Sequence, residues 1–289
     1  MHVFDKFISW WENNHCNYEA VLFDVDGTLI SGGKALPGGA DIIAWLRRHD
    51  FPFFLLTNDG NHSPQEKCES IILGGIDIAP DEIISCAHAL QSAAEEFNLK
   101  NKTVFVLGSL GSPCFAEAAG IRVTRDTREI ADCAAVIVGE GRYDWQKSIS
   151  AAVNLLKKNS EIPLIVPNPD SYWPNGKPGE IGIGAGGKAR FMAGILAEAG
   201  IMVEPVYLGK PYPAIYHYTI EVMSRRFGLD EKPHPEKVIM LGDSLASDIR
   251  GANDCGMTSG LMLTGITDFE MAEKAENSFR PDLVFRSLV

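Results

Sequence analysis

Short apolar runs alternate along the chain with longer segments in which apolar residues recur at helical spacing. Residues 20–23 and 53–56 are continuous apolar runs, and each stops at polar residues. A short apolar run bounded by a turn signal is typical of a strand buried on both faces. The segment 39–50 instead places Ile42 and Leu46 on one side of a predicted helix. Strands that alternate with helices predict parallel βαβ units and an α/β fold.

The same alternation continues to the end of the chain. We expect further strands at residues 103–107, 135–138, 163–166, 206–208, 237–241, 259–263 and 282–285. We expect helices at residues 3–13, 64–74, 87–98, 113–119, 145–158, 188–199, 213–227, 246–254 and 268–275. Residues 31–38 and 167–187 are rich in glycine and proline and are predicted to be loops. The chain is long enough for two such α/β domains.

Composition and charge exclude several kinds of partner. The 289 residues, 45% hydrophobic and 22% charged, are typical of a soluble globular protein. The net charge of −12 repels phosphate backbones and anionic bilayers, so neither nucleic acid nor a membrane surface is an expected partner. The N-terminus lacks the basic and apolar regions of a signal peptide. Six scattered cysteines without a CxxC pair predict free thiols, and we expect a cytoplasmic location.

The polar residues that end the first strand carry candidate chemistry. Asp24 directly follows the apolar run, and Asp26 lies two positions later. In an extended chain, side chains two positions apart point to the same side, and Gly27 then permits a sharp turn. Two such carboxylates can bind a hard cation such as Mg²⁺, attack an electrophile or exchange protons. The alternative is that they only cap a turn, a common use of Asp-Gly.

Three later strands also end in polar residues: Thr57 and Asn58, then Lys210, then Asp243 with Asp248 about one helical turn later. In open α/β sheets, ligands bind outside the carboxyl ends of the strands. A third carboxylate at a third strand end therefore fits a Mg²⁺ site. Each residue also has an ordinary alternative. Asp243 could cap the next helix, Lys210 could be a solvated loop lysine, and the Thr-Asn pair could cap a turn.

The order of these four sets resembles the haloacid dehalogenase (HAD) superfamily. The motifs read DVDGTL, LLTN, GKP and GDSLASD, and the four together are far more specific than any one of them. The resemblance covers nearly all of the chain after residue 19. It implies a Rossmann-like parallel-sheet core of residues 1–62 and 204–289. The insertion between the second and third motifs has the position and size of the larger α/β cap of HAD phosphatases, and we predict that cap at residues 63–203.

Sequence around the motifs resembles the NagD-like, 4-nitrophenylphosphatase-like branch of this superfamily. The supporting stretches are ALPGGADIIAWL, VPNPDSYWP, GAGGKARFMAGILAEAG and DIRGANDCGMTSGLMLTG. Because caps of this family often pair, a homodimer through the cap is an expectation. Three positions depart from the pattern. Ser247 precedes Asp248 where threonine is more usual, and its hydroxyl group is retained. Asp59 adds a negative charge beside the second motif, and Gly141 stands where relatives often carry aspartate.

The resemblance implies a role for each motif residue. Asp24 would be the nucleophile that takes the phosphoryl group. Asp26 would protonate the leaving alcohol and then activate water. Asp24, the main-chain carbonyl of Asp26 and Asp243 would bind Mg²⁺, the implied cofactor.

The remaining motif residues would bind phosphate or support the metal. Thr57 and Asn58 would hold phosphoryl oxygens, and Lys210 would neutralise the nucleophile and the phosphate. Asp248 would support the metal shell. These roles agree with the needs of phosphoryl transfer, in which positioning and charge neutralisation provide most of the catalysis.

We therefore predict a Mg²⁺-dependent phosphatase of small phosphate monoesters that works through an aspartyl-phosphate at Asp24. Dehalogenases of this fold lack the second aspartate, so Asp26 favours phosphate ester chemistry. A phosphomutase of the same fold and a non-catalytic small-phosphate-binding protein are the alternatives. Sugar phosphates, nucleoside monophosphates, pyridoxal phosphate and phosphoglycolate all suit relatives of this kind. Cap residues 168–173 and 184–190 are the expected selectors of the substrate.

Overall fold

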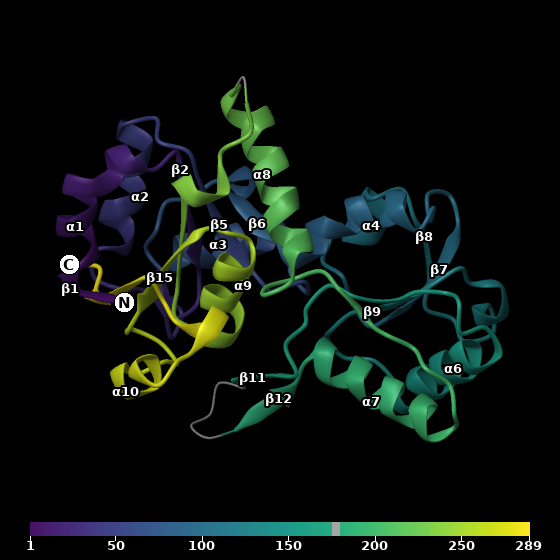
Figure 1. Ribbon diagram of the computed structural model, residues 1–289. Helices are drawn as coiled ribbons and strands as arrows, with labels where there is room; N and C mark the ends of the chain where they lie inside the picture. The colour runs from purple at the N-terminus through teal and green to yellow at the C-terminus, as the bar shows by residue number, and fades with distance from the viewer. Residues whose placement is uncertain (175–179, 230) are drawn as a thin grey trace. The chain divides into compact units, whose positions relative to one another are not determined.

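The computed structural model describes residues 1–174, 180–229 and 231–289, which divide into two compact units. The first unit contains residues 1–57, 64–84 and 210–289, and the second contains residues 58–63 and 85–209. Each unit has its own sheet with helices packed against it (Figure 1). The predicted α/β class, with a Rossmann-like parallel sheet, is confirmed.

The first unit is built on a seven-stranded sheet in the order β1-β16-β15-β14-β2-β5-β6. Its strands are β1 (His2–Lys6), β2 (Ala20–Asp24), β5 (Phe53–Thr57), β6 (Ile83–Ser85), β14 (Val238–Gly242), β15 (Thr258–Met262) and β16 (Leu283–Ser287). Every pair in it whose register is described is parallel. From β2 the chain proceeds to β5 on one side, whereas β14, β15 and β16 continue on the other. The sheet therefore has its topological switch point between β2 and β14.

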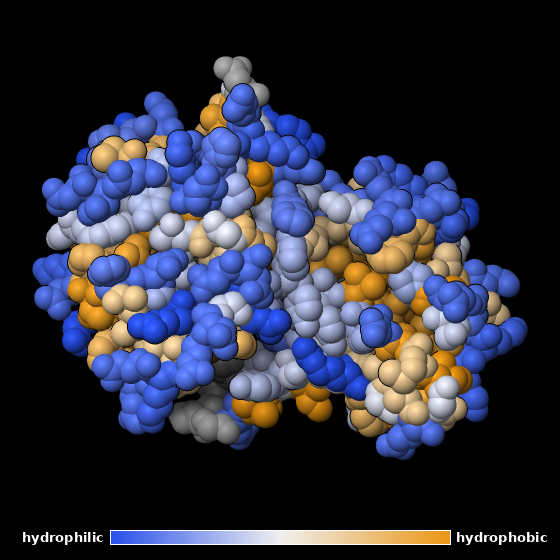
Figure 2. All heavy atoms as spheres, in the orientation of Figure 1, coloured by the Kyte–Doolittle hydropathy of each residue, from blue (hydrophilic) through white to orange (hydrophobic). Residues whose placement is uncertain are grey.

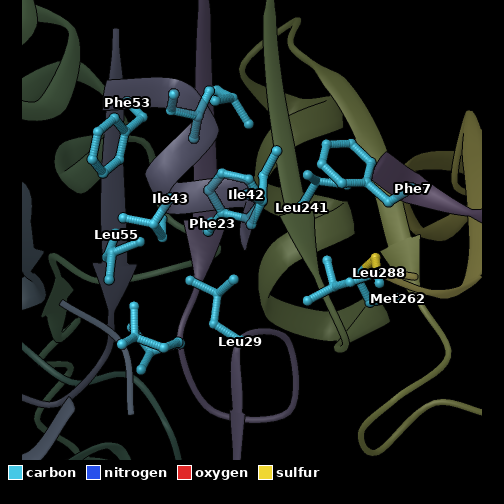
Figure 3. Packing of buried hydrophobic residues seen from close by; sticks show 14 of the residues in the cluster. Phe7, Phe23, Leu29, Ile42, Ile43, Phe53, Leu55, Leu241, Met262 and Leu288 are labelled. Atoms are coloured by element: carbon cyan, nitrogen blue, oxygen red, sulfur yellow. The ribbon is translucent and has the colours of Figure 1, made fainter. Parts of the chain in front are cut away.

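Helices cover both faces of this sheet. They are α1 (Phe7–Asn14), α2 (Gly39–Arg48), α3 (Pro64–Leu73), α8 (Pro213–Phe227), α9 (Arg250–Asp254) and α10 (Phe269–Glu273). On one face, Ile42 and Ile43 of α2 pack beside Phe23 of β2 (Figure 3). Leu261 and Val284 point to the other face, where they pack with Ala272 of α10. Burial on both faces explains the continuous apolar runs of the central strands.

The N-terminus differs from the prediction of a helix over residues 3–13. Residues His2–Lys6 instead form β1, which pairs in parallel with β16, and the helix begins at Phe7. Phe4 stacks on Phe285 at a ring distance of 5.6 Å. The apolar spacing in this segment was compatible with a helix, but pairing with an available sheet edge decides its conformation.

The second unit is built on a five-stranded sheet in the order β13-β10-β9-β7-β8. Its strands are β7 (Thr103–Leu107), β8 (Arg122–Thr124), β9 (Val136–Val138), β10 (Leu164–Val166) and β13 (Val206–Tyr207), and its helices are α4 (Leu90–Glu96), α5 (Phe115–Ala118), α6 (Trp145–Lys158) and α7 (Ala185–Glu198). Figure 1 shows α6 and α7 together on one side of β9. Leu156 of α6 and Met192 of α7 are buried in the same apolar cluster as Val136 of β9. Most of this unit lies where the sequence predicts an α/β insertion.

The boundaries of the insertion differ from the predicted 63–203. Residues 64–84 belong to the first unit, because Cys68 and Ile71 of α3 are buried in its core cluster. Residues 204–209 belong to the second unit, because Val206 of β13 pairs with Ile165 of β10. Local apolar patterns cannot reveal these memberships, since they depend on which sheet each segment joins.

The predicted loop at 167–187 contains regular structure. Residues Tyr172–Pro174 (β11) and Ile181–Ile183 (β12) form an antiparallel pair, and α7 already begins at Ala185. A Cβ on Gly182 would lie 2.4 Å from the ring of Trp173, so this glycine permits a close approach of the opposing strand. Residues 175–179 of the predicted loop lie outside the described residues. The predicted loop at 31–38 likewise includes part of a small hairpin, Ile30–Ser31 (β3) with Lys34–Ala35 (β4).

The polarity of the surface and the state of the cysteines agree with what the composition predicts. Hydrophilic residues cover most of the face shown in Figure 2. Across the part of the chain that the structure describes, no helix combines the length and apolar character needed to cross a bilayer. All six cysteines are free thiols, as predicted.

Candidate active site

The carboxyl ends of three neighbouring strands in the first unit bring predicted residues together. The strands β14, β2 and β5 lie side by side and end at Gly242, Asp24 and Thr57. Because the strands are parallel, these ends share one edge of the sheet, beside the switch point. Carboxylate oxygens of Asp24, Asp243 and Asp248 lie within 4.8 Å of one another.

Lys210 lies among these carboxylates. Its Nζ is 2.5 Å from Oδ1 of Asp24 and 2.7 Å from Oδ1 of Asp248, and it also donates to the carbonyl oxygen of Leu56 at 3.1 Å. The side chain is only 2% exposed, so the alternative of a solvated loop lysine is wrong. A buried ammonium needs such partners, since the loss of its hydration is otherwise uncompensated.

Burial and mutual repulsion shape the electrostatics of this carboxylate cluster. Burial raises the pKa of Asp24 well above its ordinary value, against the attraction of Lys210, and the charges of Asp248 and Asp243 add to the rise. Burial alone would lower the pKa of Lys210. The negative charges of Asp24 and Asp248 outweigh this effect, so the pKa of Lys210 is raised. Burial, followed by repulsion from Asp248, raises the pKa of Asp243 to about 6. Three carboxylates facing one ammonium favour a further cation.

The surroundings of Asp243 fit the predicted Mg²⁺. Its Oδ2 accepts a hydrogen bond from the backbone N–H of Ile266 at 2.7 Å. A Cβ on Gly265 would lie 1.8 Å from the same oxygen, and one on Gly27 would lie 2.3 Å from it. Because these two glycines have no side chains, the carboxylate of Asp243 can occupy this space. Converging carboxylate oxygens are the donors that Mg²⁺ prefers, so the residues present fit this metal.

Asp248 lies in a π-helical turn, Leu245–Ile249, which precedes α9. Its Oδ2 accepts from the backbone N–H of Ser244 at 3.1 Å, and a Cβ on Gly242 would lie 2.2 Å from its Cγ. The residue that caps this turn is Ser244, whose side chain accepts from the backbone N–H of Ser247. The alternative that Asp243 serves as the helix cap is therefore wrong. Single π-helical turns are frequent at functional sites.

The side chain of Asp26 does not join the cluster, contrary to the expectation that both carboxylates of DVDGTL face one site. It is 70% exposed, and its Oδ2 lies 2.9 Å from Nζ of Lys67 on α3. The chain turns here, because the backbone N–H groups of Leu29 and Ile30 both donate to the carbonyl of Val25. The rule for extended chain therefore does not apply at Asp26. Lys67 was not among the predicted site residues, since a lysine on a helix gives no signal of such a partner.

The second motif spans the boundary between the units. Thr57 is buried at the end of β5, and Asn58 is the first residue assigned to the second unit. Nδ2 of Asn58 donates to the two carboxylate oxygens of Asp170 at 3.2 and 3.3 Å. Asp170 follows β10 and lies in the stretch 168–173 that the sequence predicts to select the substrate, but the sequence did not predict its contact with Asn58.

The departures from the family pattern at Asp59 and Gly141 have local explanations within the second unit. The carboxylate of Asp59 accepts from the backbone N–H groups of Asn61 and His62 and lies 2.9 Å from Nδ1 of His62. It therefore organises its own loop. Gly141 has φ of +76°, which side chains other than glycine rarely adopt, so the aspartate common in relatives would strain this backbone.

The second unit also contains a cavity of about 430 Å³. It follows the carboxyl ends of β7, β8 and β9, and its basic lining residues are Arg125, Arg142 and Lys147. None of the site residues predicted from the sequence lines it. We therefore assign the candidate chemistry to the carboxylate cluster and not to this cavity.

Two family profiles match the chain. The profile of haloacid dehalogenase-like hydrolases matches residues 21–122, and a second, HAD-hydrolase-like profile matches residues 207–289. The two segments contain every catalytic, phosphate-binding and metal-binding residue predicted from the sequence. The middle of the second unit lies outside both matches.

Two curated relatives that are similar along most of the chain are named as phosphatases. The chain is 29% identical over 271 residues to dihydroxyacetone phosphatase of Corynebacterium glutamicum, covering 92% of this chain and 88% of the relative. It is 26% identical over 269 residues to ribonucleotide monophosphatase NagD of Escherichia coli, covering 93% and 96%.

Solved structures share the fold along almost the whole chain. NagD of Escherichia coli superposes with a TM-score of 0.78 at 23% identity and covers 94% of this chain and 97% of its own. Glycerol phosphate phosphatase of Mycobacterium tuberculosis, solved in complex with magnesium, has a TM-score of 0.78 at 22% identity. That match covers 95% of this chain and 77% of the other.

Proposed function

We propose that this chain, a phosphatase that belongs to the haloacid dehalogenase-like hydrolases and to their NagD-like branch, hydrolyses small phosphate monoesters with Mg²⁺ through a phosphorylated Asp24. The observation that carries the proposal is the 2.5 Å contact between Lys210 and Asp24 at a strand end. An anionic nucleophile can approach an anionic phosphate only where positive charge offsets their repulsion.

In the first step, Oδ of Asp24 attacks phosphorus and the bond from phosphorus to the ester oxygen breaks. Lys210 orients Asp24 and opposes the rise in its pKa that burial causes, and Thr57 and Asn58 hold phosphoryl oxygens. Asp243 and Asp24, with the main-chain carbonyl of Asp26, would hold Mg²⁺, and Asp248 would orient this group through Lys210 and Ser244. Bound Mg²⁺ supplies positive charge that offsets the charge of the transferring phosphoryl group.

Asp26 completes the proposed cycle by moving protons. It donates a proton to the leaving oxygen as the alcohol departs. It then takes a proton from the water that attacks the phosphorus of the aspartyl-phosphate. The products are the alcohol and inorganic phosphate, and Asp24 regains its carboxylate.

Phosphate release from a panel of monoesters tests the proposed function. We expect release from 4-nitrophenyl phosphate and from several sugar or nucleoside phosphates with Mg²⁺, and a return to the background rate when EDTA removes the metal. The names of the relatives make dihydroxyacetone phosphate, sugar phosphates and ribonucleotide monophosphates the first compounds to test. No release from folded protein in the presence of Mg²⁺ would contradict the proposal.

The two alternatives give different products. A phosphomutase would return an isomeric phosphate ester instead of free phosphate and alcohol, and phosphorus NMR of the products separates the two. A binding protein would take up phosphate esters without any Mg²⁺-dependent turnover. No feature of the described residues favours either alternative over hydrolysis.

The raised pKa of Asp243 predicts how pH acts on the metal-free protein. A carboxyl with a raised pKa binds its proton more tightly in the folded state. Its contribution to stability is complete below the ordinary pKa of 3.8 and is lost as pH rises through about 6. We expect the free energy of unfolding to fall by up to about 3 kcal/mol over this range. Mg²⁺ should oppose the fall, because it stabilises the ionised carboxylates.

Thermal unfolding from pH 4 to 7, in EDTA and in excess Mg²⁺, measures this effect. Asp243→Asn is the matched variant, since it keeps the side chain's size and removes the titration. Its melting temperature should depend less on pH in EDTA than that of the wild type. Identical pH dependence of the wild type with and without Mg²⁺ would argue against a metal at this cluster.

Lys67 is expected to assist Asp26 by holding its carboxylate. Replacement of Lys67 with methionine should lower kcat/KM for an alkyl ester such as glycerol phosphate by roughly two- to fivefold, because an exposed ion pair contributes little energy. The loss should be smaller for 4-nitrophenyl phosphate, whose leaving group needs no proton. Lys274→Met, which removes a surface ion pair with Glu270, is the control. It should leave kcat/KM unchanged for both esters. Equal losses for the two esters would speak against this role.

The insertion is proposed to act as a cap that selects the leaving group, and the protein is proposed to be cytoplasmic. A homodimer through the cap also remains a proposal. Its support is the set of exposed apolar side chains on β11 and β12: Tyr172, Trp173, Ile181 and Ile183. Sedimentation velocity of the full chain distinguishes a dimer from a monomer, and loss of the dimer in Ile183→Ser would identify the surface.

A further inference from the structure

Asp170, on the loop after β10, contacts a residue that the proposed function uses. Its two carboxylate oxygens lie 3.2 and 3.3 Å from Nδ2 of Asn58. Both residues belong to the second unit, and Asn58 directly follows Thr57, the last residue of β5. The insertion therefore supplies a partner for the side chain that ends the second motif.

The surroundings of Asn58 determine the orientation of its carboxamide. A Cβ on Gly209 would lie 2.5 Å from Oδ1 of Asn58, so this oxygen faces the backbone of Gly209. The nitrogen faces Asp170. An ionised carboxylate only accepts hydrogen bonds, so Asp170 selects the orientation in which Nδ2 is turned toward it. Nδ2 carries two N–H donors, and Asp170 can accept from one while the other serves a phosphoryl oxygen.

Several hydrogen bonds hold the loop that carries Asp170 in place. The backbone N–H of Asp170 donates to Oδ1 of Asn168 at 2.9 Å, and Nδ2 of Asn168 donates to Oε1 of Glu140 at 3.0 Å. The carbonyl oxygen of Asp170 accepts from the backbone N–H of Gly186 at 3.0 Å. Asn168 is buried, and Glu140 follows β9. A chain of hydrogen bonds therefore links two strand ends and the start of α7 to the backbone of Asp170, whose carboxylate contacts Asn58.

We propose that Asp170 is a positioning residue for phosphate binding, which orients the carboxamide of Asn58 so that Nδ2 is presented as the donor. The inference rests on the proposed function, because the orientation of Asn58 matters only if Asn58 binds phosphoryl oxygens. An asparagine at position 170 would keep the size of the side chain. It could present its own N–H groups to Asn58 and so favour the opposite orientation of the amide.

A double-mutant cycle tests this role. We would measure kcat/KM for 4-nitrophenyl phosphate with Mg²⁺, and the inhibition constant of inorganic phosphate, in the wild type, Asp170→Asn, Asn58→Ala and the double variant. Asp170→Asn should lower kcat/KM by about tenfold, the scale of one hydrogen bond to a charged group. It should weaken phosphate inhibition by a similar factor. In the Asn58→Ala background it should cause no further loss, because its effect acts through Asn58.

Asp132→Asn, which makes the same chemical change at an exposed site of the second unit, is the matched control and should leave kcat/KM unchanged. If Asp170→Asn does not fold, as judged by circular dichroism, Asp170→Ser replaces it in the cycle. Equal losses of kcat/KM on introducing Asp170→Asn into the wild type and into Asn58→Ala would overturn the inference. A general structural defect would lower activity whether or not Asn58 is present. A loss in Asn58→Ala with none in Asp170→Asn would also overturn it and leave the proposed function intact. Full activity of Asn58→Ala would instead refute the phosphate-binding role assigned to Asn58 in the proposed function.

Discussion

Replacement of Asp24 with asparagine is expected to reduce turnover of phosphate monoesters to the background rate, a loss of at least about 10⁴-fold. The amide cannot form the aspartyl-phosphate, and no other described carboxylate lies at the end of β2 in contact with Lys210. The fold should survive. Burial raises the pKa of Asp24, which means that the folded protein disfavours the charged carboxylate at this position. A neutral asparagine removes that charge. The melting temperature should therefore stay within a few degrees of the wild-type value or rise.

Two measurements check this result. Steady-state phosphate release gives the loss of turnover, and acid quenching during turnover followed by mass spectrometry should find a phosphoryl group on Asp24 of the wild type. Asp41→Asn, at the start of α2, is the control and should keep wild-type turnover. Retention of most activity by Asp24→Asn, or a phosphoryl group on another residue, would contradict the proposed mechanism.

Replacement of Lys210 with methionine is expected to damage both activity and stability. The change leaves Asp24 and Asp248 buried together without the ammonium that lies 2.5 and 2.7 Å from them. Removing one partner of a buried ion pair costs on the order of 3–5 kcal/mol, since the remaining charges are uncompensated. Turnover should fall by at least about 10³-fold, because the nucleophile and the phosphate lose the cation between them.

Urea unfolding at pH 7.5 and at pH 5 separates the two effects. The stability loss of Lys210→Met should be smaller at pH 5, because protonation neutralises carboxylates that have lost their partner. Lys274→Met again serves as the control, since Lys274 is exposed and lies outside the cluster. A loss of turnover without any loss of stability would indicate that the carboxylates tolerate their own repulsion, contrary to the proposed electrostatics.

Sequence alone predicted the elements whose signal is local. The apolar run before Asp24 was predicted to be a buried strand and is β2, with all five residues buried. The same reasoning correctly gave β5, β14 and the helix α6 over residues 145–158. In these elements the apolar spacing is unambiguous, because a strand buried on both faces and an amphipathic helix leave different patterns.

The order of the motifs also predicted the family, and the second aspartate of the first motif predicted phosphate ester chemistry. DVDGTL, LLTN, GKP and GDSLASD stand in an order that a chance sequence rarely reproduces. The parallel order of β14, β2 and β5 then explains why residues so far apart in the chain share one edge of a sheet. That edge could be anticipated from the strand ends, and so could the proximity of Asp24 to Asp243.

Only the tertiary structure decided which sheet each short segment joins and which side chains meet. The strand before Lys210 was expected in the core, but it pairs with β10, and residues 64–84 return to the first unit. The pairing of Asp26 with Lys67 and that of Asn58 with Asp170 have no sequence signal, because these partners are 41 and 112 positions apart. Local spacing constrains only residues within a turn or a strand of one another. Long-range contacts depend on the packed arrangement of the whole unit, so a pattern in the sequence cannot specify them.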